Sequence, residues 1–196
     1  MTGLLLGVHF LNAPPVAAQS GRCADLFSVP QKVKCVLVNG NFTELEDMLT
    51  TLLPDTPVEE VPLVIEGLEH DRAQGNVLAM LGLGAIHETG IAPVPQDISK
   101  AAGYFLDAAT AGSTEAMLRL AMIYCDGRIP APDLECFYFL RNAAEFGQAD
   151  ALLILAAQLV EKADDFDGAQ TYLEKAISLG VPGAESALRT LLQSRI

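Results

Sequence analysis

The sequence predicts an all-α fold, a short α/α-solenoid of about three stacked helical hairpins preceded by a divergent N-terminal hairpin. Three observations predict it. Alanine and leucine dominate a composition that lacks tryptophan, glycine and alanine recur at a nearly constant spacing, and the apolar residues between them follow helical periodicity. With 196 residues, of which 51% are hydrophobic, the chain is long enough to bury a sizeable core.

The repeat is visible in columns of identical or similar residues. Gly75, Gly112, Gly147 and Gly180 are 37, 35 and 33 residues apart. An alanine follows each glycine after four residues, a leucine follows after four more, and an aromatic residue stands eight residues before the next glycine. These columns are Ala79, Ala116, Ala151 and Ala184; Leu83, Leu120, Leu155 and Leu188; and Tyr104, Phe139 and Tyr172. Several independent columns in one register indicate an internal repeat.

The spacing within each unit predicts two helices. After Gly112, the residues Ala116, Leu120 and Ile123 fall on one stripe of a first helix. A turn rich in Gly, Pro and Asp follows, and a second helix carrying Phe139 ends at the next glycine, where a left-handed residue is needed. Such a hairpin cannot bury its apolar face alone. We therefore expect neighbouring hairpins to stack and to complete one another's cores.

Both ends of the array depart from the repeat pattern. Residues 42–53 and 58–74 look helical and are separated by Pro-Asp-Thr-Pro. We expect residues 19–74 to form a divergent helical cap and residues 75–196 to form the repeat solenoid. Residues after Gly180 are expected to make a last helix that closes the array, because terminal repeats lack one neighbour and are commonly atypical.

The first unit has the pattern G-x-x-x-A-x-x-x-L-G, a loop with Pro and Asp, and then A-x-x-Y-x-x-x-A-A-x-x-G. Its matching residues are Gly75, Ala79, Leu83, Gly84, Gly90, Asp97, Lys100, Ala101, Tyr104, Ala108, Ala109 and Gly112. This pattern resembles the Sel-one-like repeat, a relative of the tetratricopeptide repeat, and the second unit continues it with Tyr124, Gly127, Phe139, Ala143, Ala144 and Gly147.

The resemblance implies function by binding. It predicts a scaffold or adaptor without catalysis that holds another protein or peptide in a solenoid groove, with no cofactor; it predicts no particular oligomeric state. Candidate groove residues are those of the first helices that the repeat does not dictate, such as Arg119 and Met122. An alternative is an enzyme that binds or hydrolyses β-lactams or cell-wall fragments, as associated with some disulfide-containing secreted relatives. Its weakness is that the cysteines here bracket the turn of only one unit.

The first 18 residues predict a secretory signal peptide. They carry no Asp, Glu, Lys or Arg, and they end with the small residues Val16, Ala17 and Ala18 before Gln19. They lack the positively charged start of a typical signal, and they are too short and too interrupted by proline to form a stable membrane span. We expect a secreted or periplasmic protein after removal of residues 1–18.

The four cysteines are Cys23, Cys35, Cys125 and Cys136. An even number fits export, and the short separations favour the pairs Cys23–Cys35 and Cys125–Cys136 among the three possible pairings. Free thiols in a reducing compartment remain the alternative. A zinc site is disfavoured, because closely spaced ligand pairs are absent and no histidine lies within thirty residues of Cys125 or Cys136. Residues 163–174 faintly resemble a calcium loop, but Ala163 occupies the first ligand position.

The formal net charge is −13, which disfavours nucleic acid and anionic membranes as partners. The stretch between Cys35 and Arg72 contains no lysine or arginine but has nine acids: Glu44, Glu46, Asp47, Asp55, Glu59, Glu60, Glu66, Glu69 and Asp71. This stretch is either a solvated surface or a docking face for a basic partner. No nucleophile or phosphate-binding motif is present. His87 is expected to fill the packing position that Tyr124 takes in the next unit.

Overall fold

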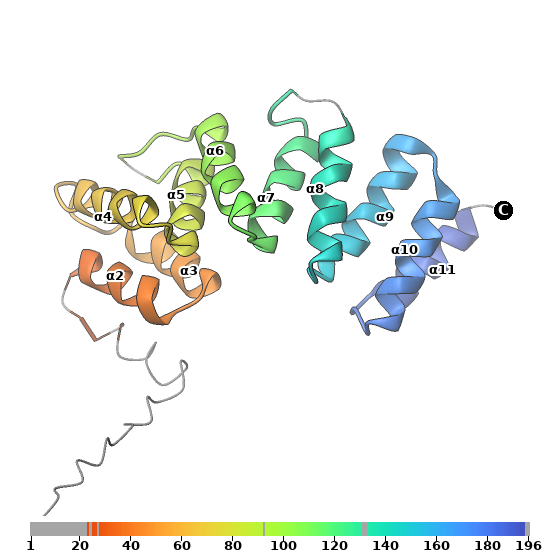
Figure 1. The fold of residues 1–196 in the computed structure, drawn as a ribbon, viewed down its shortest axis with the longest axis horizontal. Helices are drawn as coiled ribbons and strands as arrows, with labels where there is room; N and C mark the ends of the chain where they lie inside the picture. Colours follow the sequence, from red (N-terminus) through yellow and green to blue (C-terminus); the bar gives the residue numbers. More distant parts are fainter. Residues whose placement is uncertain (1–22, 24, 27, 92, 131–132, 195–196) are drawn as a thin grey trace, which may run out of the picture.

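The computed structural model describes residues 23, 25–26, 28–91, 93–130 and 133–194, and the predicted signal peptide lies outside this part of the chain. The described residues form ten α-helices and no strand, so the all-α prediction is confirmed. The helices follow one another along an elongated, curved row (Figure 1). In chain order they are α2 (Val29–Asn39), α3 (Phe42–Leu52), α4 (Val61–Ala73), α5 (Val77–Thr89), α6 (Ile98–Thr110), α7 (Thr114–Cys125), α8 (Asp133–Glu145), α9 (Asp150–Ala163), α10 (Phe166–Ser178) and α11 (Ala184–Ser194).

The predicted hairpins are α5 with α6, α7 with α8, and α9 with α10. The two helices of each pair pack closely on each other, and each second helix also packs against the next first helix, as α6 does against α7. The helix α11 packs on α10 in the same way and is the first helix of a fourth unit. This alternation is the stacked-hairpin arrangement that the repeat columns predicted.

Each second helix ends at a repeat glycine. Gly75, Gly112, Gly147 and Gly180 have φ angles of 83°, 93°, 102° and 70°, a left-handed conformation that a side chain would strain. The backbone N–H of the following residue donates to the carbonyl five residues earlier. These hydrogen bonds are Asn76 to Asp71, Ser113 to Ala108, Gln148 to Ala143 and Val181 to Ala176. The same C-terminal cap therefore ends the second helix in four successive units.

Side-chain caps begin several of the helices. The Asn76 side chain accepts from the backbone N–H groups of Leu78 and Ala79, and the Ser113 hydroxyl accepts from that of Ala116. Asp97 and Asp165 do the same at the start of α6 and α10. Turn and cap residues thus set the boundaries of the repeat helices, as the position of these polar residues before apolar stripes indicates.

The core follows the repeat columns. The column alanines Ala79, Ala116, Ala151 and Ala184 are fully buried, and so are the column leucines of the first three units. Phe105 of α6 is also fully buried, and its ring occupies the space beside Gly84 of α5, where an added Cβ would lie 2.4 Å from the Phe105 Cε1 atom. Small residues therefore let neighbouring helices approach closely enough for one aromatic ring to fill the space between them.

The N-terminal unit has three helices. The predicted helices α3 and α4 both pack against α5. The helix α2 packs against α3 and against α4, while α3 and α4 make little contact with each other. The helix α2 was not predicted. Its apolar stripe is short, with Val33, Val36 and Leu37 buried, and the surfaces that bury it belong to other helices.

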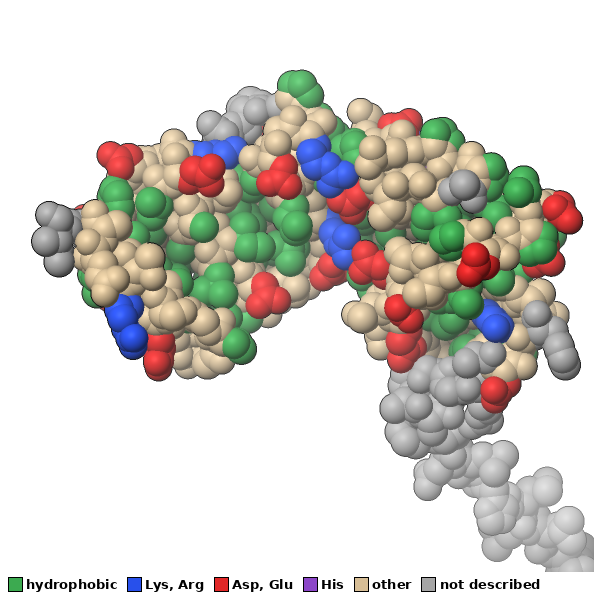
Figure 2. Space-filling model, turned by 180° about the vertical axis from the view of Figure 1, so that it is seen from behind, with side chains coloured by type: hydrophobic (Ala, Val, Ile, Leu, Met, Phe, Trp, Pro, Cys, Tyr) green, Lys and Arg blue, Asp and Glu red, His purple; other side chains and the backbone are tan. Residues whose placement is uncertain are grey.

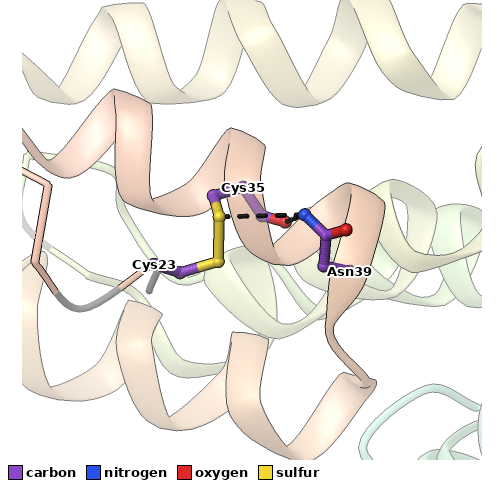
Figure 3. Close-up of a disulfide and its surroundings, with 3 residues drawn as sticks. All are labelled: Cys23, Cys35 and Asn39. Carbon is purple, nitrogen blue, oxygen red and sulfur yellow. Dashed lines mark hydrogen bonds between the residues drawn. A yellow bond between two sulfur atoms is a disulfide. The ribbon is translucent and has the colours of Figure 1, made fainter. Parts of the chain in front are cut away.

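Two disulfides occur in the described structure. Figure 3 shows Cys23 bonded to Cys35 of α2, with an S–S distance of 2.05 Å. The amide of Asn39 donates to the Cys35 carbonyl at 3.1 Å. Cys125, the last residue of α7, is bonded to Cys136 in the first turn of α8, with Cα atoms 5.0 Å apart. The second disulfide therefore joins the two ends of a hairpin turn.

Candidate binding groove between the first helices

A groove lies between α9 and α11, the first helices of two successive units. It has a volume of about 460 Å³. Its lining residues are Leu153, Ala156, Ala157, Val160 and Glu161 of α9, Ala169 and Leu173 of α10, and Ser186, Ala187, Thr190, Leu191 and Ser194 of α11. Most of these side chains are apolar. The groove is thus suited to receive apolar side chains from another molecule.

Small side chains leave this groove open. Counted from the column alanine, Ala157 stands in the position that Met122 takes on α7, and Ala187 stands in the position of Arg119. Long side chains in these positions would fill the space between neighbouring first helices. Because alanine occupies both walls here, the space stays empty at the C-terminal end of the row.

One edge of the groove carries hydroxyl groups at helical spacing. Ser186 donates to the Gly183 carbonyl at 2.8 Å, Thr190 to the Ser186 carbonyl at 3.0 Å, and Ser194 to the Leu191 carbonyl at 2.8 Å. Because these hydroxyl protons are engaged within the helix, the hydroxyl oxygens remain free to act as hydrogen-bond acceptors. A backbone or side-chain N–H group of a bound segment can therefore be satisfied along this edge, beside the apolar floor.

The predicted groove residues Arg119 and Met122 behave differently from each other. Met122 is 42% exposed on α7. Arg119 is engaged in an internal network: its Nη2 lies 2.7 Å from Glu46 Oε1, its Nε 3.0 Å from Glu115 Oε1, and its Nη1 3.4 Å from Glu88 Oε2. Glu88 also pairs with Arg128, and the Arg119 guanidinium lies over the Phe42 ring. Arg119 therefore joins the N-terminal cap to the repeats and is not available to a partner.

The electrostatics of Arg119 fit this structural role. Burial alone would lower its pKa, but the hydrogen bond with Glu115 and the charge of Glu46 outweigh burial and raise it. We expect Arg119→Ala to lower the free energy of unfolding by about 1–3 kcal/mol, because three carboxylates lose their shared cation. Hydrogen exchange should also become faster in α3, which holds Glu46. Unchanged exchange in α3 would contradict the network's role in holding the cap.

His87 takes the packing position expected from the repeat. Its ring stacks on Tyr104 with centroids 5.6 Å apart, as Tyr124 stacks on Phe139 at 5.8 Å in the next unit. The Tyr104 hydroxyl donates to Glu69, and burial together with this hydrogen bond raises the pKa of Tyr104. His87 is buried and its Nδ1 has no hydrogen-bond partner among the described residues. His87 and Tyr104 therefore form a stacking contact in the core, as the repeat predicts.

The stability of the fold should depend on His87 between neutral and mildly acidic pH. Burial, and secondarily the charge of Lys100, lower its pKa, although Asp97 and Glu69 act in the opposite direction. The unfolded chain then binds a proton more readily than the native protein, so stability falls as pH drops below about 6.5. Urea unfolding at pH 7.5 and 5.5 should show this loss, and His87→Phe should reduce it. An equal loss in the variant would assign the effect to other groups.

Some of the acids between Cys35 and Arg72 have internal partners in the structure, and others are exposed. Glu46 pairs with Arg119, and Glu69 contacts both Tyr104 and Arg72. The exposed acids Asp47, Asp55, Glu59 and Glu66 form none of the six ion pairs found within the described residues. Figure 2 shows acidic side chains spread over one face of the molecule, with fewer basic ones among them.

The stretch that resembles a calcium loop serves to begin a helix. The Asp165 side chain accepts from the Gly168 backbone N–H at 2.8 Å and caps α10, and Asp167 lies in the first helical turn. Within the described part of the chain, no group of three or more His, Cys, Asp or Glu side chains is placed to hold a metal ion. No described helix is both long and apolar enough to cross a membrane.

Comparisons with known proteins agree with the stacked helical hairpins of the structure. The Sel1 repeat model matches residues 77–113, 114–145 and 153–181. A search of curated proteins gives no match. Among solved structures, a protective antigen of uropathogenic Escherichia coli strains with an SLR fold is similar over 88% of this chain, at 19% identity and a TM-score of 0.60. A Sel1 repeat protein from Oxalobacter formigenes is similar over 63% of this chain and 95% of its own, at 24% identity and a TM-score of 0.53.

The match to the E. coli antigen covers only 40% of that protein's length, so the likeness concerns the fold and not the whole molecule. The three matched repeats coincide with the hairpins of α5 and α6, α7 and α8, and α9 and α10. Together the three matches span half of the sequence, and both structural relatives have the same solenoid architecture. The chain belongs to the Sel1 repeat family.

Proposed function

We propose that this protein is a scaffold or adaptor that binds an apolar segment of a partner protein or peptide in the groove between α9 and α11. Sel1 repeat proteins generally mediate protein–protein interactions. The observation that carries the proposal is the groove itself, about 460 Å³ of mostly apolar space with a hydroxyl edge on α11. It lies on the first helices, where the residues not dictated by the repeat are free to select a partner.

Binding in this groove needs no chemical step. Each Leu- or Phe-sized side chain that leaves water and enters the groove contributes about 1.5–3 kcal/mol, and the hydroxyl oxygens orient the segment by accepting hydrogen bonds. The groove walls are helices fixed by packing on α10, so little conformational entropy is lost when the partner binds. Affinity then depends on how well the partner's side chains fit between Ala157 and Ala187.

We also propose that the protein is exported, loses residues 1–18 and keeps both disulfides in its working state. The support is the bonding distance of each cysteine pair and the uncharged N-terminal segment. The intact mass of the purified exported protein should rise by about four hydrogen masses on reduction, and its sequence should begin at Gln19. Four cysteines that react with an alkylating agent without reductant would contradict this proposal.

The groove is tested by pull-down from the exported fraction of cells that make the protein. Ala157→Arg places a charged chain in the groove, whereas Ala111→Arg places the same chain on an exposed position after α6. We expect a partner retained by the wild type and by Ala111→Arg to be lost from Ala157→Arg. Equal retention by all three would contradict the proposal. Saturable labelling by a fluorescent penicillin would favour the β-lactam alternative.

A further inference from the structure

A second groove lies between α2 and α4 of the N-terminal unit. These two helices are at the opposite end of the row from α9 and α11 (Figure 1). The groove has a volume of about 350 Å³. Val33 and Leu37 of α2 and Val64 and Leu68 of α4 form its buried apolar floor. Leu63, at its edge, is 55% exposed. We call this feature the N-terminal groove.

The packing of the N-terminal unit explains why this groove is open. In the repeats, the two helices of a unit pack closely on each other, but α3 and α4 make little contact, and α2 packs only partly against α4. Gly67 then leaves the middle of the α4 wall without a side chain, since an added Cβ would meet no atom within 4 Å. Glycine inside a helix lowers helix stability by about 1 kcal/mol relative to alanine. Helix stability therefore does not explain why glycine occupies this position.

The walls of the N-terminal groove are held in place before any ligand arrives. Cys35 lies on α2, and its bond to Cys23 fastens that helix to the preceding chain. Val36 of α2 does not line the groove and is buried in the apolar core of the N-terminal unit, which holds α2 in place. A ligand therefore meets a preformed groove, which lowers the entropic cost of binding.

Acidic residues outnumber lysine and arginine around the groove. Glu66 and Asp71 line it, and Glu59 and Glu60 immediately precede α4. No lysine or arginine occurs between Cys35 and Arg72, and Arg72 itself pairs with Asp107 at 2.9 Å. Lys34 is the single lysine or arginine in the groove lining. The α4 side of the groove is thus negative, and a segment that combines apolar and basic residues complements it.

We propose that the N-terminal groove binds a basic amphipathic helix of a partner protein. Apolar side chains at positions i, i+3 or i+4, and i+7 of that helix would enter the groove over Gly67, and flanking lysine or arginine side chains would reach Glu66 and Asp71. This site is separate from the groove between α9 and α11, and it gives the adaptor a second binding end. The acidic stretch of the sequence then contributes partner selection as well as solubility.

The test uses a fluorescent 14-residue probe helix with leucine at i, i+3, i+4 and i+7 and lysine at most other positions. A second probe replaces the lysines with glutamates. Gly67→Phe fills the groove, and Gly103→Phe is its matched control, since Gly103 is also an exposed helical glycine whose added Cβ meets nothing within 4 Å. Glu66→Lys reverses a charge at the groove, and Glu145→Lys reverses one on the exposed surface of α8.

We expect saturable binding of the lysine probe, and binding at least tenfold weaker for Gly67→Phe than for Gly103→Phe. Glu66→Lys should weaken binding several-fold more than Glu145→Lys at low salt, and the difference should shrink at high salt. Ala157→Arg should leave this binding unchanged, which separates it from the proposed function of the other groove. Equal binding of the glutamate probe, equal effects of matched variants, or no saturable binding would each overturn the proposal. Glu66→Lys decides alone if circular dichroism shows that Gly67→Phe has lost helicity.

Discussion

Replacing Phe105 with alanine is expected to lower the free energy of unfolding by about 3–5 kcal/mol. The ring is fully buried between α5 and the α6 helix that carries it, against Gly84, and alanine would leave a cavity that the packed helices cannot close. Urea unfolding followed by circular dichroism measures the change. The neighbouring Leu106, 46% exposed on α6, provides the control, and Leu106→Ala should cost much less.

The same contact can be tested from the opposite side. Gly84→Ala would bring a Cβ to 2.4 Å from the Phe105 ring, so we expect a loss of about 1–3 kcal/mol although alanine is the better helix former. Gly103→Ala, with no neighbour within 4 Å, should instead raise stability by about 0.5–1 kcal/mol. Equal effects of the two alanines would contradict the close packing of α5 and α6 around Phe105.

Removing the disulfide between α7 and α8 is the second change with a large expected effect. The double variant Cys125→Ala, Cys136→Ala should lose about 3 kcal/mol, because closing a loop of this length restricts the unfolded chain. The two sulfur sites are buried, so solvent should reach this bond only when the hairpin opens.

The disulfide prediction can be controlled by comparing the effect of a reductant on the stability of the wild type and of the cysteine variants. Reduction should destabilise the wild type and a Cys23→Ala, Cys35→Ala variant, which still has the bond between α7 and α8. The Cys125→Ala, Cys136→Ala variant should lose less on reduction than the wild type does, since only Cys23–Cys35 remains. A wild type insensitive to reductant, with a double variant of equal stability, would show that the Cys125–Cys136 bond does not hold the hairpin.

The repeat solenoid could be predicted because each column has one local physical role. Gly112 takes a left-handed conformation at a helix end, and Ala116 is fully buried between helices, as the sequence pattern required. The helix α2 could not be predicted in this way. It occurs once, and its buried stripe becomes meaningful only when α3 and α4 lie beside it.

For the groove between α9 and α11, the sequence could predict a repeat column that contributes to it, but not the unit in which it lies. Sequence reasoning chose Met122 as a residue that the repeat leaves free, and the groove lies at the same column one and two units later, at Ala157 and Thr190. The missing information was that Ala157 and Ala187 line the same groove. A comparison of side-chain volume along each column, from Arg119 to Ala187, was the available signal.

Arg119 shows why charged residues resist such reasoning. Its partner Glu46 is 73 residues earlier in the sequence, and nothing in the repeat pattern connects the two. Glu69 similarly contacts Tyr104, 35 residues away. The acidic stretch therefore contains both internal ion-pair partners and exposed charges, a division that depends on tertiary structure alone.

Site-specific photo-crosslinking in the cells that make the protein tests directly whether the groove between α9 and α11 holds a partner. A photoreactive amino acid at position 157 lies within the groove, and the same residue at position 111 lies on an exposed site after α6. We predict a discrete crosslinked protein from position 157 and none of it from position 111. Crosslinks of equal yield from both positions, or from position 111 alone, would contradict the claim.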